Sequence, residues 1–487
     1  MFNSIVEAVF YYAKTQPDKL CLADDFSQVT YDTYTEKIRK YAGLFVQLGL
    51  QEKDTVVIEA CQTIDYLAIQ LALQLFGSIF VPVEHNCAPE KMRDFAERTE
   101  AKTVISSKAI TFNGKSSYTY DQLADMLSTA ERFNPPRFPE KDSICEILFS
   151  TGTTGKEKGI VLTNGNNIAL AQNVMYGVEM ENDNVEMIPS PMNHSHGLRR
   201  YYANMYKGCT VILLGSAMNV RRFFYNIDTF GVNSIDLVPT ALSVILRLSK
   251  NKLGEYCDKL RYIQFGAAPM METDQNIICQ LLPNTRLYNF YGSTESGCIC
   301  IYNFNRKDDK KKCIGKPTCN ARIEIVDDKN QPIASSADNV GLLSSFGPMN
   351  MLGYWKDETE TQKVLKDGAV YSNDMAYFDE DGDIILLGRR GDVINVGGMK
   401  IAPTDVESAA LTYEGIDECI CIGVDDPISG KALKLLVVMK DPSRFDVRTL
   451  RNFLMSKLEN YKVPMQYELV AEIARTYNGK LNRKAYQ

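Results

Sequence analysis

The sequence is poor in the residues that build structural metal sites. It has three histidines, and its thirteen cysteines form no C-x-x-C pair. A structural zinc site needs four cysteine or histidine ligands at short spacing, so a site of this class is disfavoured. The cysteine spacing shows no disulfide framework either. Unpaired thiols in this number predict a reducing compartment, the cytoplasm.

The chain also lacks a long apolar run and an excess of basic charge. No segment approaches the roughly 18 apolar residues that a membrane-spanning helix needs. Residues 1–14 lack the basic start and apolar centre of a signal peptide. The formal net charge is −7 and is spread along the chain, whereas nucleic-acid binders present a basic face. We therefore expect a soluble protein that neither spans a membrane nor binds nucleic acid.

Helical and strand patterns alternate over most of the 487 residues. Apolar periodicity predicts helices over 33–48, 63–76 and 166–177, and strands over 54–60, 79–83, 144–149, 210–214, 234–238, 262–265 and 286–290. This alternation predicts an α/β fold with parallel-type sheets covered by helices. A chain of this length is expected to form at least two domains.

The pattern changes in the last third of the chain. After about residue 321, short strands and turns dominate, including 323–326 and 383–387, which predicts a β-rich subdomain. A domain boundary is expected at 388–391, followed by a small α+β unit. Three prolines over 134–139 predict a linker or subdomain joint near 134–140.

The strongest local signal is the segment 150–159 (STGTTGKEKG), directly after an apolar strand. Its glycines permit tight bends, and its N–H groups, hydroxyls and lysines can surround phosphate oxygens. The candidate phosphate ligands are Ser150, Thr151, Gly152, Thr153, Thr154, Gly155 and Lys158, with Lys156 as a second possible charge. A flexible surface loop is the alternative, but the expected order of strand, loop and helix favours a nucleotide site. The segment is not a Walker A motif, because its first two glycines are too close together.

This loop resembles the phosphate-binding signature of the adenylate-forming superfamily, which includes acyl-CoA synthetases, aryl-acid ligases, luciferases and peptide-synthetase adenylation domains. Residues 289–295 (NFYGSTE) resemble the family segment that brackets adenine, contacts the α-phosphate and holds magnesium. The match implies ATP contacts at Asn289, Phe290, Tyr291, Gly292 and Thr294, and Mg²⁺ on Glu295. An aromatic face suits a purine, and a carboxylate is a hard oxygen ligand for Mg²⁺.

Three further segments follow in the family's order, so the resemblance covers nearly the whole chain. Residues 371–374 (YSND) place Asp374 where the family binds the ribose hydroxyls, and 388–401 resemble the motif that joins the two domains. By that match Arg389 contacts ribose or phosphate and Gly391 occupies the hinge. Residues 476–484 (TYNGKLNRK) place Lys480 at the position of the catalytic lysine. The implied organisation is a large N-terminal domain (1–388), a hinge (389–391) and a small mobile C-terminal lid domain (392–487).

Two other segments resemble parts of the family's acyl site. Residues 191–197 (PMNHSHG) match the segment that lines the acyl pocket, and 266–269 (GAAP) match the segment between that pocket and adenine. The match implies acyl-pocket positions at His194, Ser195 and Gly266, and ATP contacts at Ala267 and Ala268. Ser195 stands where amino-acid-activating relatives commonly carry aspartate, so an aryl or aliphatic acid is favoured over an α-amino acid.

The resemblance implies an AMP-forming acid–thiol ligase. With ATP and Mg²⁺ it would convert a carboxylic acid to an acyl-adenylate, release pyrophosphate, and pass the acyl group to the thiol of CoA or of a carrier's phosphopantetheine. Lys480 would bridge the carboxylate and the α-phosphate as a point charge, with Thr294, Glu295 and His194 as the other catalytic residues. Because Lys480 lies so near Gln487, we expect the acceptor to be a separate molecule, either CoA or a separate acyl carrier protein.

Several alternatives stay open at this point. Glu157 stands where the family commonly has proline in the phosphate loop, which could weaken ATP binding. The chain could be an amino-acid adenylation enzyme that loads a carrier protein, a luciferase-like oxygenase, or a non-catalytic nucleotide-binding relative.

Overall fold

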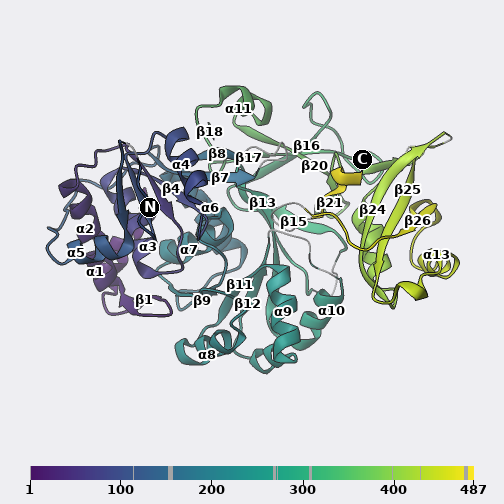
Figure 1. The fold of residues 1–487 in the computed structure, drawn as a ribbon, viewed down its shortest axis with the longest axis horizontal. Helices are drawn as coiled ribbons and strands as arrows, with labels where there is room; N and C mark the ends of the chain where they lie inside the picture. Colours follow the sequence, from purple (N-terminus) through teal and green to yellow (C-terminus); the bar gives the residue numbers. More distant parts are fainter. Residues whose placement is uncertain are drawn as a thin grey trace.

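The computed structural model describes residues 2–112, 114–151, 157–266, 270, 272–306, 310–396, 399–427, 429–475 and 481–486. Figure 1 shows the N-terminal elements on the left and a group of helices below, with α8 (Val220–Phe230), α9 (Pro239–Ser249) and α10 (Glu272–Leu281). The C-terminal strands β24 (Ile416–Asp426), β25 (Gly430–Met439) and β26 (Gln466–Leu469) stand apart on the right.

The N-terminal sheet has the strand order β18–β8–β7–β4–β3–β5–β6. Its strands are β3 (Thr55–Glu59), β4 (Ile79–Val83), β5 (Thr103–Ser106), β6 (Ser116–Thr119), β7 (Ile144–Thr151), β8 (Glu157–Thr163) and β18 (Gly353–Tyr354). Strands β3 to β7 pair in parallel, whereas β8 and β18 are antiparallel. Every residue of β3, β4 and β5 is buried, as expected for parallel strands covered on both faces.

Helices α2 (Tyr31–Gln47), α3 (Ile64–Phe76), α4 (Pro89–Arg98) and α5 (Tyr120–Leu127) accompany this sheet. Threonine side chains cap the starts of α2 and α3, where Thr30 and Thr63 accept backbone N–H groups. Residues 131–140 form an irregular connection from α5 to β7, and the sheet continues across it through the pairing of β7 with β4.

The second sheet runs β16–β17–β20–β21–β15–β14–β13–β12–β11–β9–β10–β1–β2, with β19 beside β20. Its first part comprises β1 (Leu20–Ala23), β2 (Gln28–Thr30), β9 (Val185–Ile188), β10 (Thr210–Leu213), β11 (Ser234–Leu237), β12 (Tyr262–Phe265), β13 (Arg286–Ser293) and β14 (Gly297–Asn303). From β1 through β10, β9, β11 and β12 to β13 the pairing is parallel. The predicted α/β architecture is thereby confirmed.

The other part of this sheet is antiparallel and corresponds to the expected β-rich subdomain. It contains β15 (Cys313–Pro317), β16 (Arg322–Val326), β17 (Gly341–Phe346), β19 (Leu365–Lys366), β20 (Ala369–Phe378) and β21 (Ile384–Arg389). Helix α11 (Glu358–Val364) lies between β18 and β19 in the chain.

One apolar core joins the two sheets. It combines buried side chains of α1 (Ile5–Thr15), α2, α3, α6 (Asn164–Gly177) and α7 (Ser195–Lys207) with strand residues of both sheets, such as Ile58 of β3 and Val211 of β10. The helices therefore form a layer between the sheets. This layer fixes the position of α7 relative to β11 and β13, where the second sheet turns from parallel to antiparallel.

The C-terminal unit begins after a turn. The backbone N–H groups of Asp392 and Val393 donate to the Arg389 carbonyl at 2.8 and 2.9 Å. The unit contains β22 (Ile394–Val396), β23 (Met399–Ile401), α12 (Pro403–Leu411) and α13 (Val447–Met455) beside β24–β26, with its own core. Short 3₁₀ turns complete the fold at Lys252–Tyr256, Pro442–Arg444, Asn460–Lys462 and Arg483–Tyr486.

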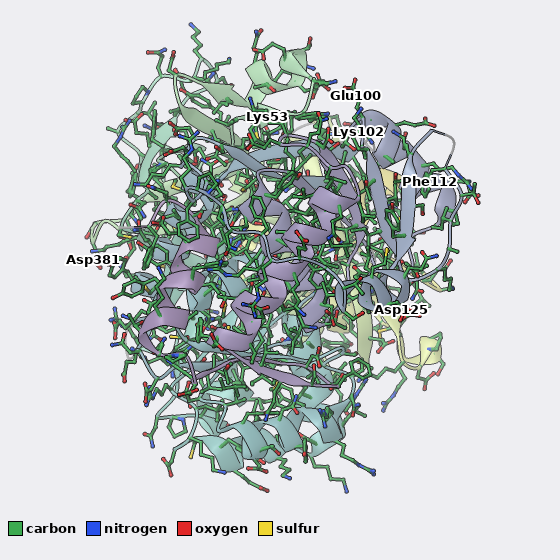
Figure 2. The ribbon with its side chains drawn as sticks, turned by 90° about the vertical axis from the view of Figure 1, so that its left-hand side faces the viewer. Lys53, Glu100, Lys102, Phe112, Asp125 and Asp381 are labelled. Carbon is green, nitrogen blue, oxygen red and sulfur yellow. The ribbon has the colours of Figure 1, made fainter. Side chains whose placement is uncertain are left out.

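The surface of the N-terminal side carries charges of both signs. Figure 2 looks onto this side and shows nitrogen-tipped and oxygen-tipped side chains intermixed, with Glu100 and Lys102 close together near its upper edge. Lys356 pairs with Glu100 at 2.5 Å. Along the described part of the chain, no helix is both long and apolar enough to cross a bilayer.

Candidate active site

The predicted phosphate loop joins two antiparallel strands. Ser150 at the end of β7 lies opposite Lys158 at the start of β8. Gly152, Thr153, Thr154, Gly155 and Lys156 lie outside the described residues, as does the side chain of Thr151. The expected order of strand, loop and helix is therefore wrong, because β8 intervenes before α6. At roughly 3.3 Å per strand residue, the start of α6 is too far away for its dipole to act on a phosphate in the loop.

Lys158 makes its main contacts with residues near β18. Its Nζ pairs with Glu360 Oε2 of α11 at 2.5 Å and lies 4.9 Å from the centre of the Tyr354 ring. Hydrogen bonds from Lys158 and Lys363 lower the pKa of Glu360 to about 2. The lysine expected to meet phosphate is thus held by a carboxylate, with which a phosphate would compete.

Glu157, which departs from the family pattern, contacts residues of α4. Its Oε1 lies 3.1 Å from Lys91 Nζ of α4, and its carbonyl accepts from Arg98 Nη2 at 2.5 Å. Burial disfavours the charged form of Lys91, but hydrogen bonds to Glu84 and Glu157 outweigh it and raise the lysine pKa. The negative charge of Glu157 is therefore balanced locally at the base of the loop.

Residues of three separate motifs meet at the junction of β13, β20 and β21. Tyr291 Oη donates to Asp374 Oδ2 at 2.5 Å, and Asp374 Oδ1 lies 3.6 Å from Arg389 Nε. Asp374 and Arg389 are paired partners in the β20–β21 ladder. Burial, followed by the charge of Asp374, raises the pKa of Tyr291 well above its ordinary value, so the hydroxyl stays a hydrogen-bond donor.

The turn that follows β13 carries the predicted magnesium ligand. Glu295 is half-buried, its Oε1 accepts from Tyr354 Oη at 3.0 Å, and its carbonyl accepts from Met351 N at 2.8 Å. Tyr354 also faces Lys158, so it links this turn to the base of the phosphate loop. Only glycine fits at position 292, because a Cβ there would lie 1.9 Å from the Gly297 carbonyl oxygen. Thr294 is half-buried in the same turn.

Asn289 and Phe290, the other predicted adenine contacts, lie in β13. Asn289 is half-buried and pairs with Phe265 of β12, whereas Phe290 is buried in the core layer. A buried ring whose face is already covered by Arg200 at 3.4 Å is not free to stack on a purine. Ala267 and Ala268 lie outside the described residues.

The predicted acyl segment forms the start of α7. His194 is the exposed N-cap residue of this helix, and the buried Ser195 accepts a hydrogen bond from Arg199 Nη2 at 2.7 Å. Gly266 faces His196, because a Cβ at position 266 would lie 2.8 Å from His196 Cε1. The structure thus brings Gly266 close to the start of α7.

A buried acid beneath this segment has no counterpart in the sequence prediction. Asp236 Oδ1 lies 2.9 Å from His196 Nε2 and 3.2 Å from Arg200 Nε, and Oδ2 accepts from Ser190 Oγ at 2.5 Å. Burial opposes ionisation of Asp236, but His196, Arg200 and Ser190 outweigh it and hold its pKa below the ordinary value. The sequence signal that could have indicated a buried charged site is the adjacent pair Arg199–Arg200, directly after the segment 191–197.

The predicted catalytic Lys480 lies outside the described residues. On either side of it, Arg475 and Leu481 form an antiparallel bridge. Arg483 donates to both carboxylate oxygens of Glu407 in α12, at 2.5 and 2.6 Å. Arg483, after Lys480 in the chain, is therefore held against α12 of the C-terminal unit.

The predicted hinge residue borders a crevice of about 650 Å³ on the C-terminal unit. Its lining includes Gly391, Asp392, Lys431, Arg483 and Tyr486. Among the described residues, none of the predicted ATP or acyl contacts lies in this lining. Gly391 itself is exposed, and a Cβ there would meet nothing within 4 Å.

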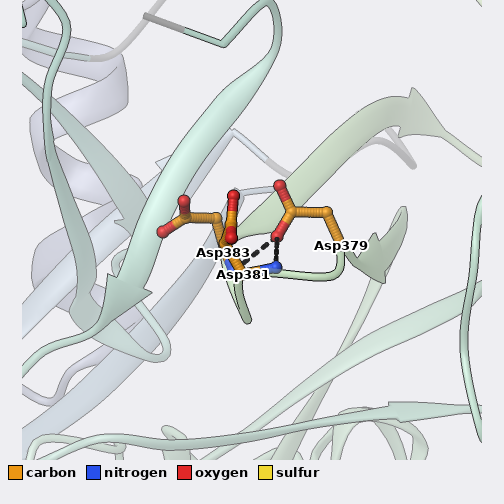
Figure 3. A group of neighbouring side chains, drawn as sticks. All are labelled: Asp379, Asp381 and Asp383. Carbon is orange, nitrogen blue, oxygen red and sulfur yellow. Dashed lines mark hydrogen bonds between the residues drawn. The ribbon is translucent and has the colours of Figure 1, made fainter. Parts of the chain in front are cut away.

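An acidic triad in the β20–β21 turn has the geometry of a cation site. Figure 3 shows Asp379, Asp381 and Asp383 converging, with Asp379 Oδ1 accepting backbone N–H groups of the other two. Lys310 Nζ lies 2.6, 2.7 and 2.8 Å from the three carboxylates. The ammonium group therefore already supplies the cation. Glu295, with one hydrogen bond and a half-exposed carboxylate, fits a Mg²⁺ ion that takes its remaining ligands from phosphate and water.

Comparison with known proteins gives consistent results over the whole chain. The family model "AMP-binding enzyme" matches residues 9–355, and the model "AMP-binding enzyme C-terminal domain" matches residues 405–480. A feruloyl-CoA synthase of Amycolatopsis is 26% identical over 477 residues, covering 96% of this chain and 95% of that protein. A 2-succinylbenzoate–CoA ligase of Bacillus cytotoxicus is 26% identical over 478 residues, with the same coverage.

Solved structures share the fold. The o-succinylbenzoate coenzyme A synthetase MenE of Bacillus subtilis, in complex with ATP and magnesium ion, superposes with a TM-score of 0.86 at 22% identity. The match covers 98% of each chain.

Proposed function

The chain belongs to the family of AMP-binding enzymes, and from this premise we propose that it activates a carboxylic acid with ATP and transfers the acyl group to a thiol. A carboxylate oxygen attacks the α-phosphorus, the bond from that phosphorus to the bridging oxygen of the β-phosphate breaks, and pyrophosphate leaves. The thiolate then attacks the acyl carbon, and AMP leaves. Two anions must meet in the first step, so the site has to neutralise charge and align the reacting atoms.

The observation that carries the proposal is the meeting of Tyr291, Asp374 and Arg389. These residues come from three segments that are far apart in the sequence, and each segment matches a motif of the family in the same order. Asp374 presents two acceptor oxygens, which suits the two ribose hydroxyls of ATP. Arg389 lies beside it and adds positive charge for ribose or phosphate.

The chain's own groups supply the electrostatics of the first step. Glu295 would hold Mg²⁺, which neutralises charge on the phosphates when bound. Lys158 would exchange Glu360 for a phosphate oxygen, and Thr294 would donate its hydroxyl to the α-phosphate. Lys480, a point charge, would bridge the acid carboxylate and the α-phosphate. His194 and Gly266 would border the acyl group.

The second step would require the C-terminal unit to rotate about 389–391. The exposed turn and the open space around Gly391 support this role, and the two family models end and begin on either side of it. We place the large domain at 1–388 and the lid domain at 392–487. A rotation there would carry Lys480 away from the adenylate and admit the thiol.

CoA is the proposed acceptor, because the relatives above are CoA synthases or ligases by name. Transfer to the phosphopantetheine of a separate acyl carrier protein is the alternative. None of the thirteen cysteines, all of which lie among the described residues, is assigned to a disulfide, which supports action in a reducing cytoplasm.

The test is pyrophosphate release with ATP and Mg²⁺ over a panel of aryl, aliphatic and amino acids. Acid-dependent release is expected for one acid class and should fall by roughly 100-fold or more in Lys480→Ala, since a charge that stabilises the transition state is lost. The matched control is Lys329→Ala, at an exposed turn in the same chain. ATP binding without acid-dependent release from any acid would instead support a non-catalytic protein.

A further inference from the structure

Two adjacent arginines lie buried beneath the predicted acyl segment. Arg200 has no exposed surface, and its guanidinium lies 3.4 Å from the centre of the Phe290 ring. Its Nε contacts Asp236, but its Nη1 and Nη2 are buried and have no hydrogen-bond partner among the described residues. Buried guanidinium nitrogens are almost always hydrogen-bonded, so two bare ones in one side chain need an explanation.

Arg199 ties the acyl segment to the ATP segment. Its Nη2 donates to Ser195 Oγ at 2.7 Å and to the Ser293 carbonyl at 3.3 Å. Ser195 belongs to the segment that matches the acyl pocket, and Ser293 to the segment that matches the adenine site. The two arginines therefore lie where the acid and the nucleotide would meet.

The charges of this cluster do not balance. Arg199 is buried, and burial lowers its pKa only to about 10, so it stays protonated at pH 7. Asp236 offsets one arginine. Glu186 is the other nearby acid, but burial raises its pKa to about 7, so it is only partly ionised. The interior around Arg199 and Arg200 thus has an excess of positive charge.

We propose that the acid activated by this chain is a dicarboxylic acid, whose second carboxylate is bound by Arg199 and Arg200. This inference rests on the proposed function and specifies its substrate class. A carboxylate supplies acceptors for the bare Nη atoms and neutralises the excess charge, and an arginine fork binds it in two places. An apolar acid would do neither. The α-ammonium group of an amino acid would meet Arg199 beside Ser195 and be repelled.

The contacts also limit the length of the acid. Gly266 faces His196, His196 contacts Asp236, and Asp236 contacts Arg200. Phe290, the ring under Arg200, is itself next to Gly266, with its Cβ 3.5 Å from the position of a Cβ there. A short dicarboxylic acid would therefore span the distance between the reacting end and the arginines.

The experiment compares acids that differ only in the second carboxylate: succinate with butyrate, glutarate with pentanoate, and terephthalate with 4-methylbenzoate. The readout is kcat/KM for pyrophosphate release by the wild-type chain, which needs no variant to fold. We expect the diacid of the best pair to be favoured by about 100-fold, the scale of a buried hydrogen bond to a charged group. Equal use of both members, or preference for the monoacid, would overturn the inference while leaving the proposed function intact.

Variants assign the preference to residues. Arg199→Gln and Arg200→Gln should each reduce the diacid-to-monoacid ratio of kcat/KM by at least about 10-fold. The control Arg221→Gln, on the exposed side of α8, should leave the ratio unchanged. Unchanged ratios in both folded variants would show that the arginines serve the core rather than the substrate, which would also overturn the inference. If no acid in the panel releases pyrophosphate, the proposed function fails and this inference with it.

Discussion

Glu146 is a buried acid whose protonation should influence how stability changes with pH. It lies in β7 and is 2% exposed, and its Oε2 accepts from Tyr202 Oη at 2.5 Å. Burial raises its pKa from 4.5 to about 7, although hydrogen bonds with Tyr202 and Asn167 act in the opposite direction. The folded protein therefore holds this proton more tightly than the unfolded chain does.

The size of the effect follows from the two pKa values. A raised folded-state pKa gives stability that is fully present below pH 4.5 and is lost as the pH rises through 7. At about 1.4 kcal/mol for each unit of pKa, the loss amounts to about 3 kcal/mol. Glu186, whose pKa burial also raises to about 7, should add a second loss in the same direction.

The perturbation is Glu146→Gln, which keeps an acceptor for Tyr202 but cannot ionise. We expect the unfolding free energy of the variant, relative to the wild type, to rise by about 2.5 kcal/mol between pH 5 and pH 8, because a small part of the loss already occurs below pH 5. Urea titrations at both pH values measure this difference, and the exposed Glu131→Gln is the control. A difference between variant and wild type that does not change with pH would refute the assignment of a raised pKa to Glu146.

Three further predictions concern the site. Gly391→Pro should preserve acid-dependent pyrophosphate release but reduce CoA-dependent thioester formation by at least about 10-fold, because proline restricts the hinge. Separate assays of the two half-reactions measure this, and equal losses in both would contradict the prediction. Gly266→Ala should lower kcat/KM for the acid by about 10-fold and leave KM for ATP unchanged, because the added methyl group would clash with His196. Wild-type kinetics for the acid in this variant would show that the acid binds elsewhere. Glu360→Gln should lower KM for ATP by about 2- to 5-fold, because the Glu360 carboxylate would no longer compete with phosphate for Lys158. An unchanged or higher KM for ATP would show that the ion pair instead positions Lys158 for phosphate binding.

The parts of the fold that the sequence predicted best are its buried strands. β4 and β12 have the predicted bounds, because short apolar runs bounded by turn residues leave few alternatives. β8 was missed as a strand. Its apolar stretch is only Ile160–Leu162, and the preceding Glu-Lys-Gly is unfavourable in strands. It forms because it pairs with β7 on one side and with β18 on the other.

Site residues that lie in a family motif could be predicted from the sequence, whereas contacts set by tertiary packing could not. The ladder pairing of Asp374 with Arg389 agrees with the proximity that the family resemblance implies. By contrast, the ion-pair partner of Lys158 is Glu360 of α11, 202 residues further along the chain. A local sequence pattern cannot predict a contact at that separation. Arg199 and Arg200, which the sequence analysis did not select, are buried in α7 by tertiary contacts of the same kind.

The most direct test of acyl-adenylate formation is to follow oxygen from the acid. An acid that supports pyrophosphate release would be labelled with ¹⁸O in its carboxylate and converted with ATP, Mg²⁺ and CoA, and the products examined by mass spectrometry. If the carboxylate oxygen attacks the α-phosphorus, AMP carries one ¹⁸O atom and pyrophosphate none. Unlabelled AMP, or label in pyrophosphate or inorganic phosphate, would contradict the account.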